Sequence, residues 1–346
     1  MAAAEYKVLI EPHGRHITVS ADRPVLDGAL AAGLNLPHSC KSGHCASCRA
    51  RLLAGEINYP NGVPVGLTAQ ESQAGNILLC QARAGSDLVV EARLIASVAE
   101  VDIKTLPCRI ARLNPLAADV MQVFLRLPAV ETLRFHPGQY LDILLDGERR
   151  RSFSIASPPH DSELLELHVR RVPGGEFTDR LFGATASVGS LLRLEGPIGQ
   201  FVYRESQAPL LMIAGGTGFA PLKSMLRHIL ENGVDRPVHL YWGARQPHDV
   251  YEEELVLEWV RQNRQLRFTA VLSEATGTKA PHHRLGWVHE AVLADHPSLE
   301  PFDVYAAGPP ALVEAIRASF PRRGVREDRL FFDSFDYASD PKPRPT

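Results

Sequence analysis

Residues 40–48 read Cys40-Lys-Ser-Gly-His-Cys45-Ala-Ser-Cys48, and another cysteine, Cys80, follows after a long gap. This C-x4-C-x2-C spacing with a distant partner is typical of plant-type [2Fe–2S] centres. Two irons need four thiolates, and one compact loop can supply three of them while a separate strand supplies the fourth. We therefore predict that the metal ligands are Cys40, Cys45, Cys48 and Cys80.

Other interpretations of the cysteines are open. Structural zinc is less favoured, because zinc sites usually show two close cysteine pairs and only Cys45 and Cys48 are this close. A Rieske centre needs two histidines in place of two cysteines, so His44 is interpreted as a loop residue. The remaining cysteine, Cys108, is expected to be a small buried hydrophobic side chain.

The 346-residue chain has the composition of an ordinary globular protein, with 45% hydrophobic and 22% charged residues and a net charge of −3. The charge pattern predicts neither a nucleic-acid nor a membrane partner, and no apolar stretch reaches the roughly 18 residues that cross a bilayer. Because the first residues lack the pattern of a signal peptide, we expect a cytoplasmic location and reduced cysteines. We also expect a monomer.

Three stretches of the chain differ in hydrophobic pattern. Residues 1–96 combine short alternating runs with a helical pattern and the cysteine loop. Residues 104–205 alternate short strands with Gly/Pro turns, which indicates an antiparallel barrel. Residues 206–337 alternate apolar strands with helices, which indicates a parallel sheet. The strands predicted there are Leu210–Ala214, Val238–Trp242, Phe268–Leu272 and Val304–Ala306.

A glycine-rich turn, Gly215-Gly-Thr-Gly-Phe-Ala-Pro221, follows the apolar run Leu210–Ala214. A strand, a glycine turn and a helix in this order aim backbone amides at a pyrophosphate. Proline suits the first helical turn, where its missing N–H does no harm. We predict a nucleotide-binding turn whose contact residues are Gly216, Thr217, Gly218 and Pro221.

Two stretches of the middle third can contact a flavin dinucleotide. Arg151 can pair with phosphate, Phe153 can stack on a flat ring and Ser154 can hydrogen-bond near N5 of that ring. The glycine turn before Thr178 can offer amides and a hydroxyl to the pyrophosphate. A solvated strand end and an ordinary tight turn are the alternatives. The residues assigned to the flavin are Arg151, Ser152, Phe153, Ser154, His168, Val169, Arg170, Gly174, Gly175 and Thr178.

The order of these motifs resembles the ferredoxin–NADP reductase superfamily over nearly the whole chain. Arg151-Ser-Phe-Ser154 is similar to its Arg-x-Tyr-Ser flavin motif, and Ala307-Gly308-Pro309 is similar to its Cys-Gly-Pro motif, with Ala307 in place of the cysteine. Ala46 stands where the cysteine loop of this family usually has glycine. The resemblance implies that Gly308, Pro309 and Arg245 contact the nicotinamide nucleotide. The pair His282-His283 matches no motif and is expected to lie in a surface loop.

The resemblance implies a multidomain fold of the α+β and α/β classes. Its parts would be a β-grasp [2Fe–2S] ferredoxin domain over residues 1–96, an antiparallel β-barrel FAD domain over 104–205 and a parallel-sheet NAD(P)-binding domain over 206–337. NADH is the expected donor, with NADPH as the alternative, because Arg245 is the single basic residue that follows Tyr241-Trp242-Gly243.

The chain is similar to the reductase components of bacterial oxygenases and to the CDP-6-deoxy-Δ3,4-glucoseen reductases. This similarity implies an enzyme that passes electrons from NADH, through FAD and a [2Fe–2S] cluster, to a separate protein. That acceptor would be an oxygenase or a PMP-dependent sugar dehydrase. No catalytic acid or base is expected, because hydride transfer needs none. The alternative is a non-catalytic iron–sulfur sensor or storage module with a decayed NAD site, which Ala307 would support.

Overall fold

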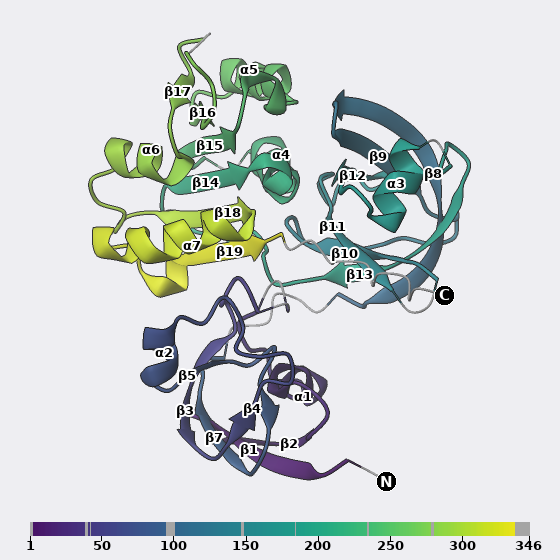
Figure 1. Ribbon diagram of the computed structural model, residues 1–346. Coiled ribbons are helices and arrows are strands. Elements are labelled where there is room, and N and C mark those ends of the chain that lie inside the picture. Colours follow the sequence, from purple (N-terminus) through teal and green to yellow (C-terminus); the bar gives the residue numbers. More distant parts are fainter. Residues whose placement is uncertain are drawn as a thin grey trace. The chain divides into compact units, whose positions relative to one another are not determined.

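The computed structural model describes residues 3–38, 41, 43–94, 101–146, 149–183, 185–233, 235–277 and 280–335 (Figure 1). Contacts divide the chain into two compact units: residues 1–100 with 332–336, and residues 101–331 with 337–346. None of the helices in the described ranges combines the length and the apolar character that a membrane crossing requires.

The first unit contains a five-stranded mixed sheet in the order β2-β1-β7-β3-β5. Its strands are β1 (Glu5–Glu11), β2 (Arg15–Ser20), β3 (Arg49–Ala54), β5 (Asn76–Leu78) and β7 (Leu88–Glu91), accompanied by the short strands β4 (Ile57–Asn58) and β6 (Arg83–Ala84) and the helices α1 (Val25–Ala31) and α2 (Ala69–Gln73). β1 and β2 form an antiparallel hairpin, in which Val8 and Ile17 lie opposite each other in the core. A Cβ on Gly28 would lie 2.4 Å from Val19 Cγ1, so glycine lets α1 lie directly on β2.

The second unit begins with a six-stranded sheet in the order β11-β10-β13-β8-β9-β12, in which every pairing is antiparallel. Its strands are β8 (Lys104–Ala117), β9 (Val120–Arg126), β10 (Tyr140–Leu144), β11 (Arg150–Ser154), β12 (Leu165–Arg170) and β13 (Leu191–Ile198), and α3 (Glu176–Phe182) follows β12. Ile155, which directly follows the edge strand β11, forms an isolated bridge with Leu167 of the other edge strand, β12. Cys108 is 3% exposed in this core, which confirms that it is a buried core side chain, and this burial raises the pKa of its thiol to about 12.

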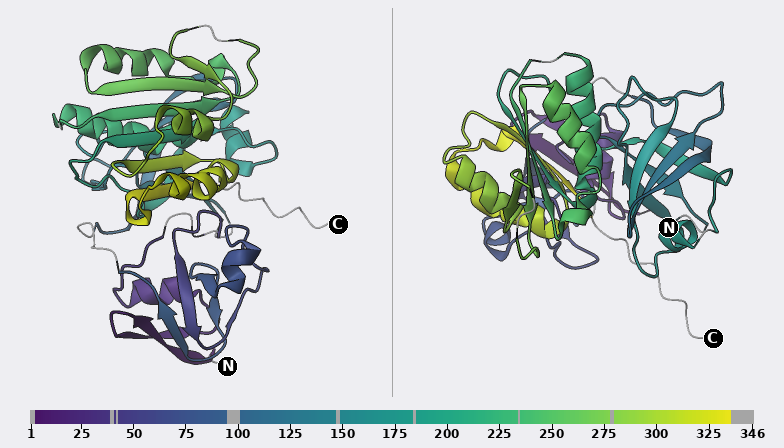
Figure 2. Two further views of the ribbon diagram at one scale, coloured as in Figure 1. Left: turned by 90° about the vertical axis from the view of Figure 1, so that its left-hand side faces the viewer. Right: turned by 90° about the horizontal axis from the view of Figure 1, so that it is seen from above.

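A second six-stranded sheet, in the order β17-β16-β15-β14-β18-β19, follows in the chain. Its strands are β14 (Leu210–Gly215), β15 (Val238–Ala244), β16 (Leu266–Leu272), β17 (His283–Leu285), β18 (Asp303–Gly308) and β19 (Leu330–Ser334), and its helices are α4 (Phe219–Glu231), α5 (Glu253–Gln262), α6 (Val288–Asp295) and α7 (Pro310–Ser319). β14 pairs in parallel with both β15 and β18. Figure 2 shows α4 and α5 on one face of the sheet and α6 and α7 on the other, the covering that an almost wholly parallel sheet needs.

A buried ion network joins the two sheets of the second unit. The Lys223 ammonium, on α4, donates to Glu166 Oε1 on β12 at 2.7 Å and to both carboxylate oxygens of Glu252 at 2.6 and 2.8 Å. His168 Nε2 lies 2.9 Å from Glu166 Oε1, and His168 Nδ1 lies 3.0 Å from the Tyr251 hydroxyl. The same buried cation therefore holds together α4, the residue before α5 and strand β12 of the antiparallel sheet.

The charges of this network are stabilised by one another. Burial alone would raise the pKa of Glu166, but the hydrogen bond from His168 and the Lys223 ammonium outweigh it and hold that pKa well below its ordinary value. The stabilisation by the carboxylate is therefore present above the unfolded-state pKa of a glutamate, about 4.3, and is lost as the pH falls through the lower folded-state pKa.

Replacement of the central cation tests this network. Lys223→Met leaves Glu166 and Glu252 as buried charges without a counter-ion, and the free energy of unfolding of the second unit should fall by about 3–5 kcal/mol. Urea unfolding followed by tryptophan emission measures this, because all three tryptophans, Trp242, Trp259 and Trp287, belong to this unit.

Lys104→Met is the matched control. Its side chain is 41% exposed and lies 3.6 Å from Glu131, so its loss should change the free energy of unfolding by no more than about 1 kcal/mol. If Lys223→Met proved as stable as the parent protein, the network would not hold the two sheets together.

Candidate cofactor sites

Three of the four predicted ligand cysteines lie together in the first unit. Cys45 and Cys48 precede β3, Cys80 follows β5, and their exposures are 2%, 3% and 4%. The Leu79 N–H donates to the Cys48 carbonyl at 3.2 Å and holds the two segments together. Cys40 lies outside the described residues, so its place in the set stays a prediction.

The loop around these cysteines has an unusual backbone. Lys41 and Ala46 have left-handed φ angles of 53° and 52°, a conformation that costs an L-residue roughly 1–2 kcal/mol. Ala46 thus takes the conformation that glycine would favour at this position. The Ser47 N–H, one residue on, lies 3.4 Å from Cys45 Sγ and donates to it. An amide that faces a sulfur stabilises negative charge on it.

The neighbouring chain lies very close to this loop. A Cβ on Gly66 would lie 2.4 Å from the carbonyl oxygen of His44, and a Cβ on Gly43 would lie 2.7 Å from Pro64 Cβ. The Gly66 N–H donates to the Gly43 carbonyl at 2.9 Å. Glycine is therefore required at both positions, and the main chain itself determines the loop conformation.

The thiols oppose each other's ionisation. A hydrogen bond with Cys80, burial, and the nearby charges of Cys80 and Cys45 raise the pKa of Cys48 well above its ordinary value. Thiolates gathered in this way are unfavourable unless cations neutralise them, and metal binding does so by displacing the protons. The donor set of sulfurs fits an iron–sulfur cluster.

The glycine turn of the second unit lies where the strand order reverses. The chain runs outward from β14 through β15 and β16 to β17, and then returns to place β18 on the other side of β14. In parallel sheets a ligand binds beyond the carboxyl ends of the strands at this point. The 3-10 turn Gly216–Gly218 follows β14, and Pro309 follows β18, so the predicted nucleotide residues are brought to one edge.

The two strand ends touch through their backbones. A Cβ on Gly218 would lie 1.9 Å from the Ala307 carbonyl oxygen, and a Cβ on Gly308, whose φ is 152°, would lie 2.9 Å from Gly215 Cα. Pro221 lies in the first turn of α4, as predicted. The turn is therefore intact beside Ala307, the residue at which the sequence departs from the family motif.

The sequence did not predict the part that Trp242 plays. Its indole N–H donates to the Gly216 carbonyl at 3.0 Å, and its ring stacks on Phe219 with the centroids 3.9 Å apart. Trp242 therefore holds the glycine turn from the adjacent strand. A tryptophan within an apolar strand needs an acceptor for its N–H, but the pattern does not reveal which one.

Arg170 brings positive charge to the glycine turn. The guanidinium of Arg170, at the end of β12, has Nη2 only 3.3 Å from the position that a Gly216 Cβ would occupy. Its buried Nε has no hydrogen-bond partner among the described residues, a donor that a phosphate oxygen would satisfy. Arg245 is 56% exposed at the end of β15, and both arginines lie near Asp119, at 3.3 and 3.9 Å.

The predicted flavin motif lies on β11. Because strand residues alternate, Arg151 and Phe153 share one face and Ser152 and Ser154 share the other. Phe153 is half-buried beside Phe177, with ring centroids 5.4 Å apart, so an aromatic wall is present. Ser154 is buried, whereas the Ser152 hydroxyl donates to Asp142 at 2.6 Å.

Several residues assigned to the flavin are already hydrogen-bonded within the protein. The Thr178 hydroxyl donates to the Val172 and Gly175 carbonyls, at 2.9 and 3.1 Å. The Gly174 N–H donates to Asp179 Oδ2 at 3.1 Å, and the Gly175 N–H donates to the Val172 carbonyl. These groups shape the turn before α3, so any contact with a pyrophosphate requires an exchange of partners.

Two further assigned side chains are buried elsewhere. His168 belongs to the Lys223 ion network, and Val169 is fully buried in the core of the antiparallel sheet. The contact of His168 and Val169 with the flavin stays a prediction.

Family models match three successive parts of the chain. The model described as the 2Fe-2S iron-sulfur cluster binding domain matches residues 8–85. The oxidoreductase FAD-binding domain matches residues 107–203, and the oxidoreductase NAD-binding domain matches residues 212–318. These matches identify [2Fe–2S], FAD and NAD as the cofactors, which confirms the cofactors predicted from sequence.

Relatives match almost the full length. CDP-6-deoxy-L-threo-D-glycero-4-hexulose-3-dehydrase reductase from Yersinia pestis is 36% identical over 330 residues, 95% of this chain and 98% of that protein. The reductase component of propane 2-monooxygenase from Rhodococcus jostii is 34% identical over 348 residues, 96% of this chain and 92% of that protein.

A solved structure is also similar: the Amycolatopsis cytochrome P450 reductase GcoB has a TM-score of 0.75 at 32% identity and covers 96% of this chain and 100% of its own. Together, the cysteine cluster, the glycine turn at the switch point and these full-length relatives show that the chain belongs to the family of three-domain [2Fe–2S], FAD and NAD(P)H reductases of the ferredoxin–NADP reductase superfamily.

Proposed function

We propose that this reductase takes electrons from NADH and delivers them singly to a separate protein, either an oxygenase or a PMP-dependent sugar dehydrase. The observation that carries the proposal is the occurrence in one chain of the gathered thiols Cys45, Cys48 and Cys80 and of a glycine turn at the switch point of a parallel sheet. The relatives include a dehydrase reductase and a monooxygenase reductase component, which supports both acceptor classes equally.

FAD and the cluster, when bound, accept two electrons together from the nicotinamide donor and release them one at a time. The protein's task is to bind and orient them. Arg151 and Arg170 are proposed to meet phosphate groups, Phe153 to cover the flat ring, and the turn Gly216–Gly218 to admit the nicotinamide nucleotide to the strand ends. No side-chain acid or base is needed, and we assign none.

Two finer points belong to the same proposal. The antiparallel sheet is proposed to close as a barrel, which the Ile155–Leu167 bridge and the Ala156 N–H donating to the Glu166 carbonyl at 2.7 Å support. The domains are proposed to span residues 1–96, 104–205 and 206–337. The alternative of a non-catalytic module finds no support, because the full-length relatives are reductases and the turn beside Ala307 is intact.

The acceptor is identified by reconstitution. The purified reductase, NADH and one oxygenase or one sugar dehydrase at a time should give product turnover with one class of acceptor at a rate above that with free flavin. Failure with every member of both classes, from a protein that still reduces cytochrome c, would disprove the proposed acceptors but leave the reductase activity in place.

Loss of one ligand thiol separates the two halves of the electron route. Cys80→Ser should leave reduction of the flavin by NADH at the parental rate, since Cys80 lies in the first unit, and should lower cytochrome c reduction at least about tenfold, since the cluster needs four thiolates. Anaerobic stopped-flow absorbance, with flavin and cluster bands followed separately, measures both steps.

Cys108→Ala is the control for that experiment, because Cys108 is a buried core thiol of the antiparallel sheet. It should retain the iron content and both rates. Parental cytochrome c reduction in Cys80→Ser would show that electrons leave the protein by another route.

A substitution in the glycine turn provides a second test. Gly218→Ala places a Cβ 1.9 Å from the Ala307 carbonyl, so the turn must move, and a displacement of about 1 Å near reacting groups can lower a rate about 100-fold. We expect a fall of that size in flavin reduction by NADH. Gly277→Ala, where an added Cβ meets no atom within 4 Å, should react like the parent; equal rates in both variants would contradict the assignment.

The choice of nucleotide follows from the carboxylates beside Arg245. Asp249 and Asp119 lie 3.6 and 3.9 Å from its guanidinium and would repel a 2′-phosphate, so kcat/KM should favour NADH over NADPH at least about tenfold. Asp119→Asn should narrow this preference about two- to fivefold, whereas Asp235→Asn, at an exposed position, should not. Steady-state kinetics of the parent and of both variants, with NADH and with NADPH, measure this preference. A parent protein that prefers NADPH would reverse the assignment.

A further inference from the structure

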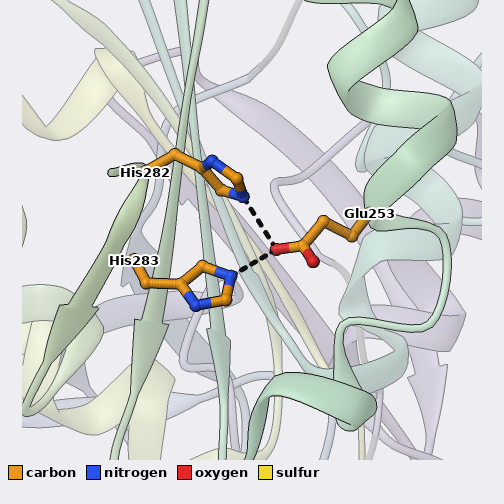
Figure 3. Close-up of side chains that lie close together, drawn as sticks. All are labelled: Glu253, His282 and His283. Carbon is orange, nitrogen blue, oxygen red and sulfur yellow. Dashed lines mark hydrogen bonds and ion pairs between the residues drawn. The ribbon is translucent and has the colours of Figure 1, made fainter. Parts of the chain in front are cut away.

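Three side chains that the redox sites do not use converge at the edge of the parallel sheet. Glu253 is the first residue of α5, His283 is the first residue of the edge strand β17, and His282 directly precedes that strand. Figure 3 shows both imidazole rings pointing at the Glu253 carboxylate. His282 Nε2 lies 3.0 Å and His283 Nε2 lies 2.6 Å from the same oxygen, Oε1.

The expectation that the two histidines form a surface loop pair was wrong for His283, whereas His282 lies in a turn with its side chain 20% exposed. His283 is only 6% exposed and pairs in parallel register with Ala270 of β16. Its partner Glu253 is 30 residues away in the sequence, so no local pattern links them.

The spacing of the three groups suits a metal ion. One ligand atom from each residue lies within 4.8 Å of the other two. Around a tetrahedral zinc with bonds of about 2.0–2.1 Å, neighbouring ligand atoms lie about 3.3 Å apart. The two Nε2–Oε1 distances, 3.0 and 2.6 Å, lie within an ångström of this value. Imidazole and carboxylate ligands together favour divalent transition metals such as Zn²⁺.

A second cluster of related composition provides the contrast. Glu166, His168 and Glu252 are also close enough to hold a metal, but the Lys223 ammonium already lies between their carboxylates. In the described part of the chain, Glu253 has no lysine or arginine within ion-pair distance, and its recorded partners are the two histidines. Of these two clusters, the one at Glu253 is therefore the one that still lacks a cation.

We propose that Glu253, His282 and His283 bind a divalent transition metal, with Zn²⁺ as the representative ion. The three ligands leave one coordination position for water, because the Glu253 and His282 side chains are 22% and 20% exposed. The bound ion ties the beginning of α5 to the edge strand β17. The proposal is independent of the reductase function, since none of the three residues belongs to the redox sites.

Two features limit the affinity. Glu253 lies in the first turn of α5, where the helix dipole favours anions over cations by typically 0.3–1 kcal/mol. His283 Nδ1 is buried without a hydrogen-bond partner in the described residues, whereas metal-bound histidines usually have a second-shell acceptor. The site should therefore exchange its ion with a chelator and not retain it as a structural zinc finger does.

The experiment uses untagged full-length protein with intact iron and flavin content, so that neither a tag nor vacant cysteines bind the probe. Zn²⁺ is titrated in competition with a chromogenic chelator, and thermal unfolding is followed with and without Zn²⁺. We expect one exchangeable Zn²⁺ per chain and a higher midpoint of unfolding of the second unit. Glu253→Gln and His282→Ala should each weaken binding at least tenfold and abolish the shift.

His289→Ala, in α6, is the control and should bind Zn²⁺ like the parent. Parental flavin reduction by NADH verifies the fold of each variant, and if one variant does not fold, the other decides. Absence of exchangeable zinc in the parent, or undiminished binding in the folded variants, overturns the proposal. Loss of reductase activity in the parent would affect the proposed function and leave this site unchanged.

Discussion

In both sites assigned to redox groups, two stretches of backbone lie so close together that only glycine fits between them. A Cβ on Gly66 would lie 2.4 Å from the His44 carbonyl oxygen, and one on Gly218 would lie 1.9 Å from that of Ala307. Such contacts hold the cysteine loop and the nucleotide turn against their neighbours through the main chain, and glycine permits them because it has no Cβ. The strands and helices around them hold these backbones in contact.

Buried charge adds a second constraint within the second unit. Lys223 lies between carboxylates from β12 and from the residue that precedes α5. If either element moved away, a buried charge would lose its partner at a cost of several kcal/mol. The network therefore restricts the position of the flavin-side sheet relative to the nucleotide-side sheet, as hydride transfer between bound groups requires. The cluster at Glu253 has related groups but no ammonium between them.

The sequence predicted the elements near each site well, because their signals are local. The apolar run Leu210–Ala214 is β14, and the glycine turn and helix follow it as expected. The roles of individual polar side chains were less predictable. Thr178 hydrogen-bonds to carbonyls of its own turn, and His168 belongs to an ion network. A hydroxyl or an imidazole bonds whichever partner the fold brings near, and that partner is often far away in the chain.

The sequence alone predicted the sulfur ligands, through the C-x4-C-x2-C spacing of Cys40, Cys45 and Cys48, and the nucleotide turn, through a glycine turn after a buried strand, since both signals are local. Only the tertiary structure decided that β18 lies beside β14 and that Trp242 supports Gly216. It also decided that Glu253 meets two histidines about thirty residues away. The reason is physical: strand order and the pairing of distant polar groups arise from packing the whole unit, which a local pattern does not encode.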